Sequence, residues 1–401
     1  MTRVRTAAVI GGGIAGPVTA LALHKAGIET TVYESYPTPA EGVGGTIALA
    51  PNGMAALDIV DAAHEAAAVS HPADRQVMRV GRHLLELPGL AGAGPFHVVR
   101  RNDLHRILRD RATAKGIRIE HGKQLIDVRE EPAAITAVFA DGSDAKADVL
   151  IGADGVHSVV RRLIDPAAPG PRYTGMLSFE GWSTARVPDD PGTMTFAFGK
   201  RGYYLYWPTP DGGTTYGVNL PHQRPLTIGE ARAVPEESWL RTLREVYGED
   251  LPGGDLIDRT NPGALQVNGA LHIMPDVPRW HRARMVLVGD AVHAPSNSSG
   301  QGASLAIESA VQLARCLRDI DDMPSAFAAY ERLRRGRVER VAARARRINH
   351  TKTPGRVGQA LIPILMPLFV KVAMRPEKTV GPELRYRIDW HTPVTREPQV
   401  A

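Results

Sequence analysis

The hydrophobic pattern at the start of the chain predicts a strand, a helix and a second strand. Residues 7–10 form a short apolar run, residues 14–26 have helix-forming composition rich in Ala and Leu, and residues 30–33 are β-branched or aromatic. The apolar run suits a buried parallel strand, and the following segment suits a helix that packs on it. This order is typical of the first unit of a doubly wound α/β domain.

The pattern changes twice further along the chain. Residues 76–99 alternate between apolar and polar side chains, and strand-like aromatic segments dominate residues 172–270, where an amphipathic helix is predicted at 236–247. A second buried strand is predicted at 283–288, and an apolar helix face follows from residue 303. The pattern therefore returns to strand–helix alternation after an antiparallel interruption.

We expect from this order an α/β fold in which a discontinuous Rossmann-like domain carries an inserted antiparallel-sheet domain and a C-terminal helix. The expected Rossmann-like domain consists of residues 1–75, 100–171 and 271–350. The inserted domain consists of residues 76–99 and 172–270, and the C-terminal helix and tail of residues 351–401.

Composition and charge narrow the class of protein. The 401 residues carry a formal net charge of +5, and Arg is concentrated in residues 332–347. That run has helical composition without interleaved aromatic residues, so we interpret it as a solvated helix face and expect no nucleic-acid partner. Cys316 is the only cysteine, which excludes an intrachain disulfide. The first strand begins too early for a signal peptide. The early strand and the single cysteine together favour a cytoplasmic protein.

The longest apolar stretch, residues 357–374, is interrupted by two prolines and a lysine. Such a segment does not suit a membrane span. We expect a C-terminal helix packed on the body of the protein, and membrane contact is the less favoured alternative.

A glycine-rich turn between the first strand and helix carries the strongest single signal. Gly11, Gly13 and Gly16 form G-x-G-x-x-G, and Glu34 ends the second strand. In this context the glycines serve a tight turn, close approach of a pyrophosphate, and close helix–strand contact. The helix N-terminus offers N–H groups to phosphates, and the acid can accept hydrogen bonds from a ribose 2′-OH. The unit therefore predicts a dinucleotide site without identifying the dinucleotide.

Two further glycine–acid turns follow predicted buried strands. One is Gly152-Ala-Asp154-Gly155, and the other is Gly289-Asp290-Ala-Val-His293 with Gly300-Gln-Gly302 at a helix start. Together the three stretches resemble the group A FAD-dependent monooxygenases, the para-hydroxybenzoate hydroxylase-like aromatic hydroxylases. Chain length and layout are similar to the branch of salicylate hydroxylases and tetracycline-inactivating monooxygenases. The resemblance covers roughly residues 4–350, and it implies an FAD-binding Rossmann-like domain and an inserted substrate domain.

The resemblance also implies contacts between FAD and individual residues. It places the pyrophosphate on the first glycine-rich turn, the adenosine ribose at Glu34, and the flavin pyrimidine edge at the helix start after Gly302. Asp290 is implied to contact the ribityl chain or pyrophosphate, and Asp154 belongs to a motif that serves both FAD and NAD(P)H. The implied cofactor contacts are Gly11, Gly13, Ile14, Ala15, Gly16, Glu34, Arg101, Leu125, Asp154, Gly155, Asp290, Gly302 and Ala303.

Two positions depart from the family pattern. Ser35 follows the acid of the second strand where relatives often carry Arg, which removes one expected adenosine contact. Asn297 stands where relatives commonly carry Pro, and the nearby proline is Pro295. We therefore expect a different loop shape beside the edge of the flavin that reacts with oxygen.

A substrate pocket is expected between the flavin ring and the inner face of the 172–270 sheet. In a regular strand Tyr204 and Tyr206 share one face, while Tyr203, Leu205 and Trp207 share the other, and the sequence does not decide which face is inner. The candidate pocket residues are Phe196, Tyr204, Tyr206 and Asn297.

The resemblance implies a monooxygenase reaction. NAD(P)H would reduce FAD and leave, and O2 would then form a flavin C4a-hydroperoxide that delivers one oxygen atom to an aromatic or polycyclic small molecule. No metal is expected, and no catalytic acid or base is identified. Alternatives on the same fold are a flavin-dependent reductase or dehydrogenase and a halogenase, although Trp182 lacks the paired-tryptophan motif of flavin halogenases. A third alternative is a non-catalytic flavoprotein that binds an aromatic compound.

Overall fold

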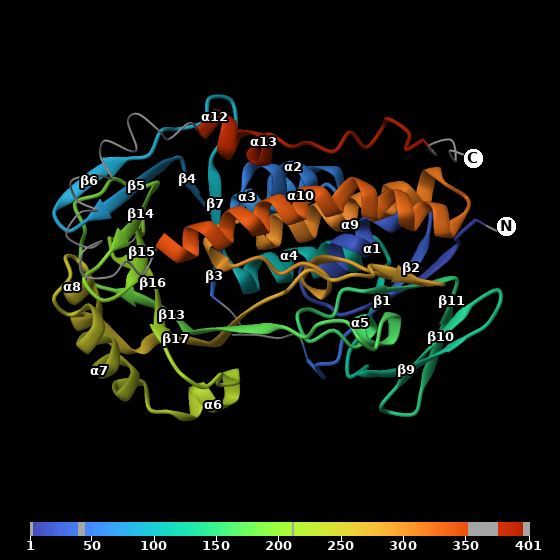
Figure 1. The fold of residues 1–401 in the computed structure, drawn as a ribbon, viewed down its shortest axis with the longest axis horizontal. Coiled ribbons are helices and arrows are strands. Elements are labelled where there is room, and N and C mark those ends of the chain that lie inside the picture. The colour runs from blue at the N-terminus through green and yellow to red at the C-terminus, as the bar shows by residue number, and fades with distance from the viewer. Residues whose placement is uncertain (1–2, 39–44, 211, 352–375, 396–401) are drawn as a thin grey trace.

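A mostly parallel sheet organises the larger half of the computed structural model, which describes residues 3–38, 45–210, 212–351 and 376–395 (Figure 1). Its strand order is β18-β19-β12-β1-β2-β8, and the strands from β19 to β8 pair in parallel. The bounds are β1 Thr6–Ile10, β2 Glu29–Tyr33, β8 Arg118–Glu120, β12 Val149–Gly152, β18 His281–Arg282 and β19 Met285–Leu287. β12 and β19 are buried along their whole length because secondary structure covers both faces of this sheet.

Helices cover one face of this sheet, and α5 with the antiparallel strands β9, β10 and β11 covers the other (Figure 1). α9 packs against α1, α2 and α10, and its apolar side supplies much of the core. The helix bounds are α1 Ala15–Lys25, α2 Pro51–Ile59, α3 Ala63–Ala68, α4 Arg101–Ala114, α5 Val159–Ile164, α9 Gly302–Asp319 and α10 Met323–Thr351. The strand bounds are β9 Leu125–Glu130, β10 Ile135–Phe139 and β11 Asp144–Ala147.

A second, largely antiparallel sheet forms the other half of the molecule, with the order β17-β13-β16-β15-β14-β5-β6 (Figure 1, left). Its strands are β5 Arg75–Val80, β6 His83–Glu86, β13 Arg172–Ser183, β14 Thr193–Phe198, β15 Tyr203–Pro208, β16 Thr214–Pro221 and β17 Thr260–Ile273. α6 Ile228–Ala233, α7 Glu236–Tyr247 and α8 Gly253–Asp258 accompany this sheet, and side chains of all three helices share a core with it.

A small sheet of order β3-β7-β4 lies between these two halves. Its strands are β3 Thr46–Leu49, β4 His71–Ala73 and β7 Phe96–Arg100. β5 and β6 join the second sheet as the 76–99 pattern suggested, whereas β7 pairs with β3 and β4. The mixed α/β fold is thus confirmed, and the division into domains stays a prediction.

The C-terminal region adds two short helices, α12 Pro376–Thr379 and α13 Gly381–Leu384. The apolar stretch at 357–374, predicted as a packed helix, lies outside the described residues. Among the helices that are described, none combines the length and apolar character needed to cross a membrane.

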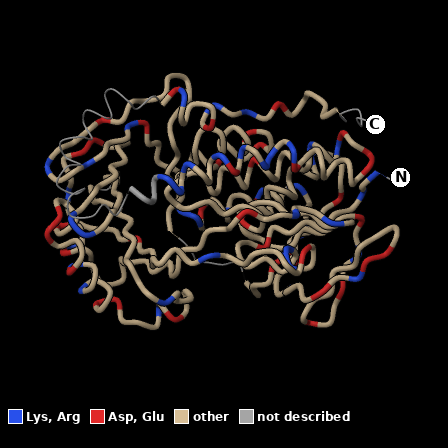
Figure 2. Tube along the Cα trace, viewed as in Figure 1, with Lys and Arg blue, Asp and Glu red and all other residues tan. Residues whose placement is uncertain are grey.

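The arginine run on α10 is only partly the solvated face that its composition predicted. Figure 2 shows Lys and Arg interspersed with Asp and Glu over the fold. Arg334 and Arg337, however, are buried and form ion pairs with Glu308 of α9 at 2.7 and 2.8 Å. The side chains that were predicted to lie in water instead join α10 to α9.

Candidate functional site

The three glycine–acid turns meet at one edge of the parallel sheet. β19, β12, β1 and β2 are neighbours, so the turns that follow them lie at the same carboxyl edge. Gly289-Asp290 follow β19, Asp154 follows β12, Gly11 follows β1 and Glu34 follows β2. With strands about 4.8 Å apart, this row extends over about 14 Å. Motifs far apart in the sequence therefore form one extended surface.

Each glycine of the first turn is required, or allowed, for a different structural reason. Gly11 has a φ of +105°, and a Cβ there would lie 2.5 Å from the carbonyl oxygen of Ala153. A Cβ on Gly16 would lie 1.9 Å from the carbonyl oxygen of Gly11, so this glycine lets α1 approach the turn. A Cβ on Gly13 would meet nothing within 4 Å. Gly13 therefore leaves open space beside the start of α1, where no side chain caps Ile14 and Ala15.

Glu34 organises the turn at the β2 end of this edge. Its Oε2 accepts a hydrogen bond from the N–H of Gly12 at 2.6 Å, and its Oε1 accepts from the N–H of Tyr36 at 2.8 Å and the hydroxyl of Ser35 at 3.0 Å. Leu125, expected near adenine, is buried and is held close by the bond from Lys123 N–H to the Glu34 carbonyl at 2.8 Å. These two candidate residues therefore lie at one end of the site.

Asp154 is used by the fold itself. Its carboxylate accepts hydrogen bonds from the Ser158 hydroxyl at 2.5 Å and from the N–H groups of Val159 and Val160 at 2.7 and 3.1 Å. These bonds fix the start of α5. Burial raises the pKa of Asp154, and the hydrogen bonds oppose that shift. Next to it, Gly155 has a φ of +72° and open space around an added Cβ, so its backbone stays accessible.

Asp290 has no comparable partner. It is half-buried, and no described residue donates a hydrogen bond to its carboxylate. Burial raises the pKa of Asp290, and the positive charge of the exposed Arg101 lowers it in part. The preceding Gly289 has a φ of +60°, and its Cβ would lie 3.0 Å from that of Ala15 and 3.2 Å from that of Ala306. The turn that carries Asp290 thus packs, through Gly289, against the first turns of α1 and α9.

The start of α9 is also open to a ligand. The N-cap residue Gln301 makes no capping side-chain bond, and a Cβ on Gly302 would meet nothing within 4 Å. Gln301 itself is buried and accepts a hydrogen bond from Asn52 Nδ2 at 2.9 Å, and Asn52 also donates to Glu308 at 2.7 Å. The first N–H groups of α9, at Gly302 and Ala303, are held in place from behind.

Two residues missed in the sequence connect the turns. Arg161 is buried and donates to the carbonyl oxygens of Ala291 and Val156, each at 2.8 Å, which joins α5 to the Asp290 turn. His105 lies one helical turn after Arg101 on α4, and its Nε2 is 2.6 Å from the carbonyl oxygen of Gly12. This i, i+4 spacing was a signal that could have linked His105 to Arg101.

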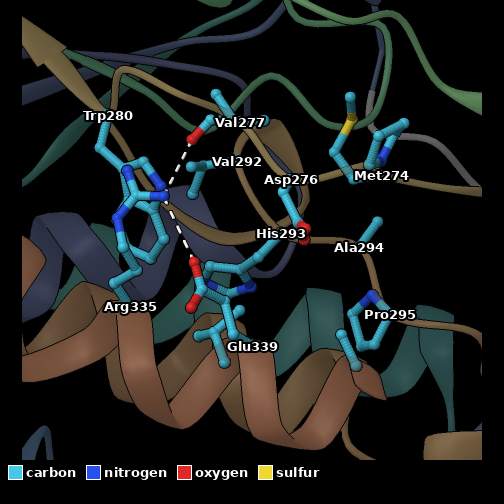
Figure 3. A pocket seen from close by; sticks show the side chains of 13 residues that line it. Met274, Asp276, Val277, Trp280, Val292, His293, Ala294, Pro295, Arg335 and Glu339 are labelled. Carbon is cyan, nitrogen blue, oxygen red and sulfur yellow. Dashed lines mark hydrogen bonds and ion pairs between the residues drawn. The ribbon is translucent and has the colours of Figure 1, made fainter.

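His293 belongs to the structural support behind the site. Its Nε2 lies 2.8 Å from the Ser309 hydroxyl, and no described residue bonds its buried Nδ1. It lines a small cavity of about 20 Å³, room for about one water, beside Trp280, Arg335 and Glu339 (Figure 3). Burial lowers the pKa of His293 to about 3, so the ring is neutral at pH 7. The histidine therefore supports α9 as an uncharged group.

A larger cavity of about 800 Å³ lies between the second sheet and the β3-β7-β4 sheet. Residues at its wall include Thr46, Arg100, Glu180, Trp182, Trp207 and Thr215. The start of α4 lies between the cavity and the cofactor edge, because Asn102 lines the cavity and His105, three residues later, lies at the glycine-rich turn.

None of the four candidate pocket residues lines this cavity. Tyr204 and Tyr206 point to the helix-covered face of β15, where they are buried with Trp239 and Tyr247. Phe196 packs beside Trp207 on the cavity-facing side without reaching the cavity wall. Asn297 is exposed in the turn Asn297–Ser299 and does not line the cavity. Both faces of β15 are apolar, which is why the alternation of its residues did not identify the inner face.

The features at the sheet edge fit FAD. Two helix N-termini without capping side chains suit phosphates and an electron-rich ring edge, and Gly13 leaves space for a pyrophosphate. A family model described as an FAD binding domain matches residues 3–345. The chain belongs to the FAD-dependent monooxygenases. The matched residues include both sheets of the fold, so the family assignment applies to most of the length of this flavin monooxygenase.

Named relatives of this monooxygenase are enzymes of similar length. It is 33% identical to a 3-amino-4-hydroxybenzoate 2-monooxygenase of Streptomyces cremeus, over 85% of this chain and 86% of the relative. It is 29% identical to a 3-hydroxybenzoate 6-hydroxylase of Klebsiella oxytoca, over 85% and 87%. These relatives support the assignment as an FAD-dependent monooxygenase.

Solved structures share the fold. The structure of Klebsiella pneumoniae HpxO with FAD and uric acid has a TM-score of 0.78 at 24% identity and covers 95% of both chains. The tetracycline destructase Tet(55) has a TM-score of 0.68 at 22% identity, over 94% of this chain and 97% of the other. These structures show the same fold, and the predicted family resemblance is confirmed by the family match and the named relatives.

Proposed function

We propose that this monooxygenase uses NAD(P)H and O2 to hydroxylate an aromatic or polycyclic small molecule in the cavity between the two halves of the fold. The observation that carries the proposal is the cavity of about 800 Å³, whose wall includes Trp182 and Trp207 and which is joined to the glycine-rich turn by the start of α4. Its volume lies within the range of small-molecule sites and leaves room for more than one ring. The names of the hydroxybenzoate relatives support an aromatic substrate.

The residues of the sheet edge would hold FAD. Bound FAD would supply hydride acceptance from NAD(P)H and the activation of O2. N–H groups at the starts of α1 and α9 would face its pyrophosphate and its pyrimidine edge, and Glu34 would bind the adenosine ribose. Such a helix N-terminus stabilises nearby negative charge by about 0.3–1 kcal/mol at exposed positions.

The residues behind the edge would keep these groups in place. Arg161 holds the turn that carries Asp290, and Asn52 holds Gln301 at the start of α9. Rigid donors do not need to reorganise when charge develops beside them, and for this reason fixed N–H groups are effective in redox and acyl-transfer sites. The fold thus supplies binding and orientation, while no side chain is required as a proton donor in this scheme.

The test begins with the visible spectrum of the purified protein and continues with NADH and NADPH oxidation against aromatic acids, phenols and polycyclic compounds. We expect bound flavin, substrate-stimulated NAD(P)H oxidation, and one atom of ¹⁸O from ¹⁸O2 in the product. Gly13→Ala is the matched variant, because the fold tolerates it while the methyl group occupies the space assigned to the pyrophosphate.

Other outcomes would contradict the proposal. Oxidation of NAD(P)H without oxygen in the product would indicate a reductase or dehydrogenase, and a halide-dependent product would indicate a halogenase. A protein that binds an aromatic compound and stays colourless after FAD is added would be a binding protein.

A further inference from the structure

The acidic side chains at the wall of the large cavity are already engaged. Glu180 accepts hydrogen bonds from the N–H and the hydroxyl of Thr46, both at 2.7 Å. Glu236 accepts from backbone N–H groups of β17 at 2.9–3.1 Å. Asp103 forms an ion pair with Arg106 at 3.3 Å. These acids therefore maintain the protein structure around the cavity.

The two arginines at the same wall differ from each other. Arg232 donates from Nε to the carbonyl oxygen of Val267 at 3.4 Å. Arg100 ends β7 and is exposed at the cavity wall, and its guanidinium group forms no hydrogen bond or ion pair with any residue that the structure describes. Burial raises the pKa of the nearby Glu180 carboxyl, and the hydrogen bonds from Thr46 and the positive charge of Arg100 oppose that shift. Arg100 thus keeps its five N–H donors available.

The surroundings of Arg100 define the kind of ligand that it suits. The guanidinium group is a planar donor that binds carboxylate and phosphate oxygens in pairs. Trp182 and Trp207 lie at the wall of the same cavity and offer flat apolar surface. Trp182 is held in place by the bond from its Nε1 to the Thr209 hydroxyl at 3.3 Å. A ligand that combines an anionic group with an aromatic ring would match both features.

We propose that Arg100 is the anion-binding residue of this cavity and pairs with the carboxylate or phosphate of a ligand whose aromatic ring lies against Trp182 and Trp207. The inference rests on the proposed function and names the class of ligand at the same site. Two sources share this chemistry: a free aromatic acid as substrate, and the nicotinamide nucleotide as reductant. Arg101, the next residue, lies within electrostatic reach of Asp290, so the two neighbouring arginines have different tasks.

The test measures equilibrium binding to the FAD-loaded enzyme by flavin absorbance and tryptophan fluorescence. The probes are 3-hydroxybenzoate, its neutral analogue 3-hydroxybenzamide, and NADPH, each with wild type, Arg100→Gln and Arg100→Lys. Arg129→Gln is the matched control, because it removes an exposed arginine from β9 at the opposite end of the molecule (Figure 1). Thermal melting checks that each variant is folded.

If the ligand is an aromatic acid, Arg100→Gln weakens 3-hydroxybenzoate binding at least tenfold, leaves 3-hydroxybenzamide unchanged, and is partly rescued by Arg100→Lys. If the ligand is the nicotinamide nucleotide, the same loss appears for NADPH alone. The proposal is overturned if Arg100→Gln behaves like Arg129→Gln for both anions, if acid and amide are weakened equally, or if the wild type binds neither anion.

These outcomes are separate from those of the proposed function. An enzyme that incorporates ¹⁸O while Arg100→Gln leaves all ligand affinities unchanged would retain the function and lose this inference. An enzyme that binds an aromatic acid through Arg100 but yields no oxygenated product would retain the anion site and lose the function.

Discussion

Replacing Gly13 by alanine tests the proposed cofactor site without disturbing the fold. An added Cβ at this position has no heavy atom within 4 Å, and Gly13 is not among the described glycines with positive φ. A Gly→Ala change at a compatible position stabilises a protein by about 0.4–1 kcal/mol, because it restricts the unfolded chain. The apoprotein of Gly13→Ala should therefore melt at or slightly above the wild-type temperature.

The same methyl group occupies the space beside the uncapped start of α1. If the pyrophosphate approaches the backbone there, phosphate oxygens must move away from the N–H groups of the helix, and these charge-assisted bonds weaken. Loss of about 1.4 kcal/mol corresponds to a tenfold higher Kd, and we expect at least that change for FAD.

Gly16→Ala provides the contrast within the same turn. Its Cβ would lie 1.9 Å from the carbonyl oxygen of Gly11, so α1 must shift away from the turn. Overpacking of this kind costs about 1–3 kcal/mol. This variant should lose thermal stability as apoprotein and FAD affinity together, whereas Gly13→Ala should lose FAD affinity alone.

The assay prepares apoprotein of the three forms, titrates each with FAD while following flavin fluorescence, and records thermal melts before and after addition. An unchanged Kd for Gly13→Ala, together with an unchanged melt of its apoprotein, would refute the placement of the pyrophosphate. A melt of the Gly13→Ala apoprotein as low as that of Gly16→Ala would refute the claim that Gly13 faces open space.

Two further predictions concern the buried polar groups behind α9. Glu308→Gln leaves Arg334 and Arg337 without their carboxylate partner, and breaking a buried ion pair costs about 3–5 kcal/mol. The denaturation midpoint of this variant should therefore fall well below that of Glu249→Gln, which breaks an exposed ion pair and serves as the control. Equal midpoints of the two variants would contradict this role of Glu308. For His293, the folded-state pKa of about 3 lies below the ordinary value of 6.5, so only the unfolded chain takes up this proton as the pH falls from 6.5 toward 3. Stability therefore falls in that window by up to about 1.4 kcal/mol per pH unit, and denaturation of His293→Asn at pH 7 to 4 should show a shallower slope; an unchanged slope would contradict the assignment.

Local patterns predicted the elements that carry the cofactor motifs. The first strand, helix and second strand were expected at 7–10, 14–26 and 30–33, and all six ends are found within one residue of these positions. The helix at 236–247 has the predicted bounds, because its apolar positions are spaced for a helix and all face the second sheet. In α7 one face is buried and the other is not, so its periodicity is informative, whereas β1 and α1 are buried on nearly all sides and were predicted from continuous apolar runs around the glycine-rich turn.

Other elements depend on contacts that periodicity does not contain. β15 has apolar side chains on both faces, since one packs on α7 and α8 and the other on the β3-β7-β4 sheet. α6 was missed although Thr227 and Glu230 form a capping box, a signal that was present in the sequence. α8 begins with two glycines and offered no comparable signal. Tertiary packing thus decided the inner face of β15, whereas α6 could have been found from its local signal.

The arginine run shows how composition can mislead. Arg334 and Arg337 share a stripe of α10 with the buried Tyr330 and Val341, at spacings of three and four residues. Their burial is possible because Glu308 lies opposite on α9, and that partner is distant in the sequence. If only the residues on this stripe had been considered, and not the composition of the whole run, the burial of Arg334 and Arg337 could have been predicted.

One physical criterion links the cofactor edge and the cavity. Polar groups inside proteins nearly always have hydrogen-bond partners, and most around this site do: Glu34 and Asp154 are engaged by backbone N–H groups. Asp290 stands apart, because it is half-buried and no described residue donates a hydrogen bond to its carboxylate. Arg100 at the cavity wall is exposed, so its guanidinium group has water rather than another described residue as its partner. Between them, Arg101 continues the chain from β7 into α4, so a single strand-to-helix junction connects the two unengaged charges. For Asp290 a ligand that brings the missing donor is the simplest explanation, whereas Arg100 would exchange water for an anionic ligand, which is what its substitution tests.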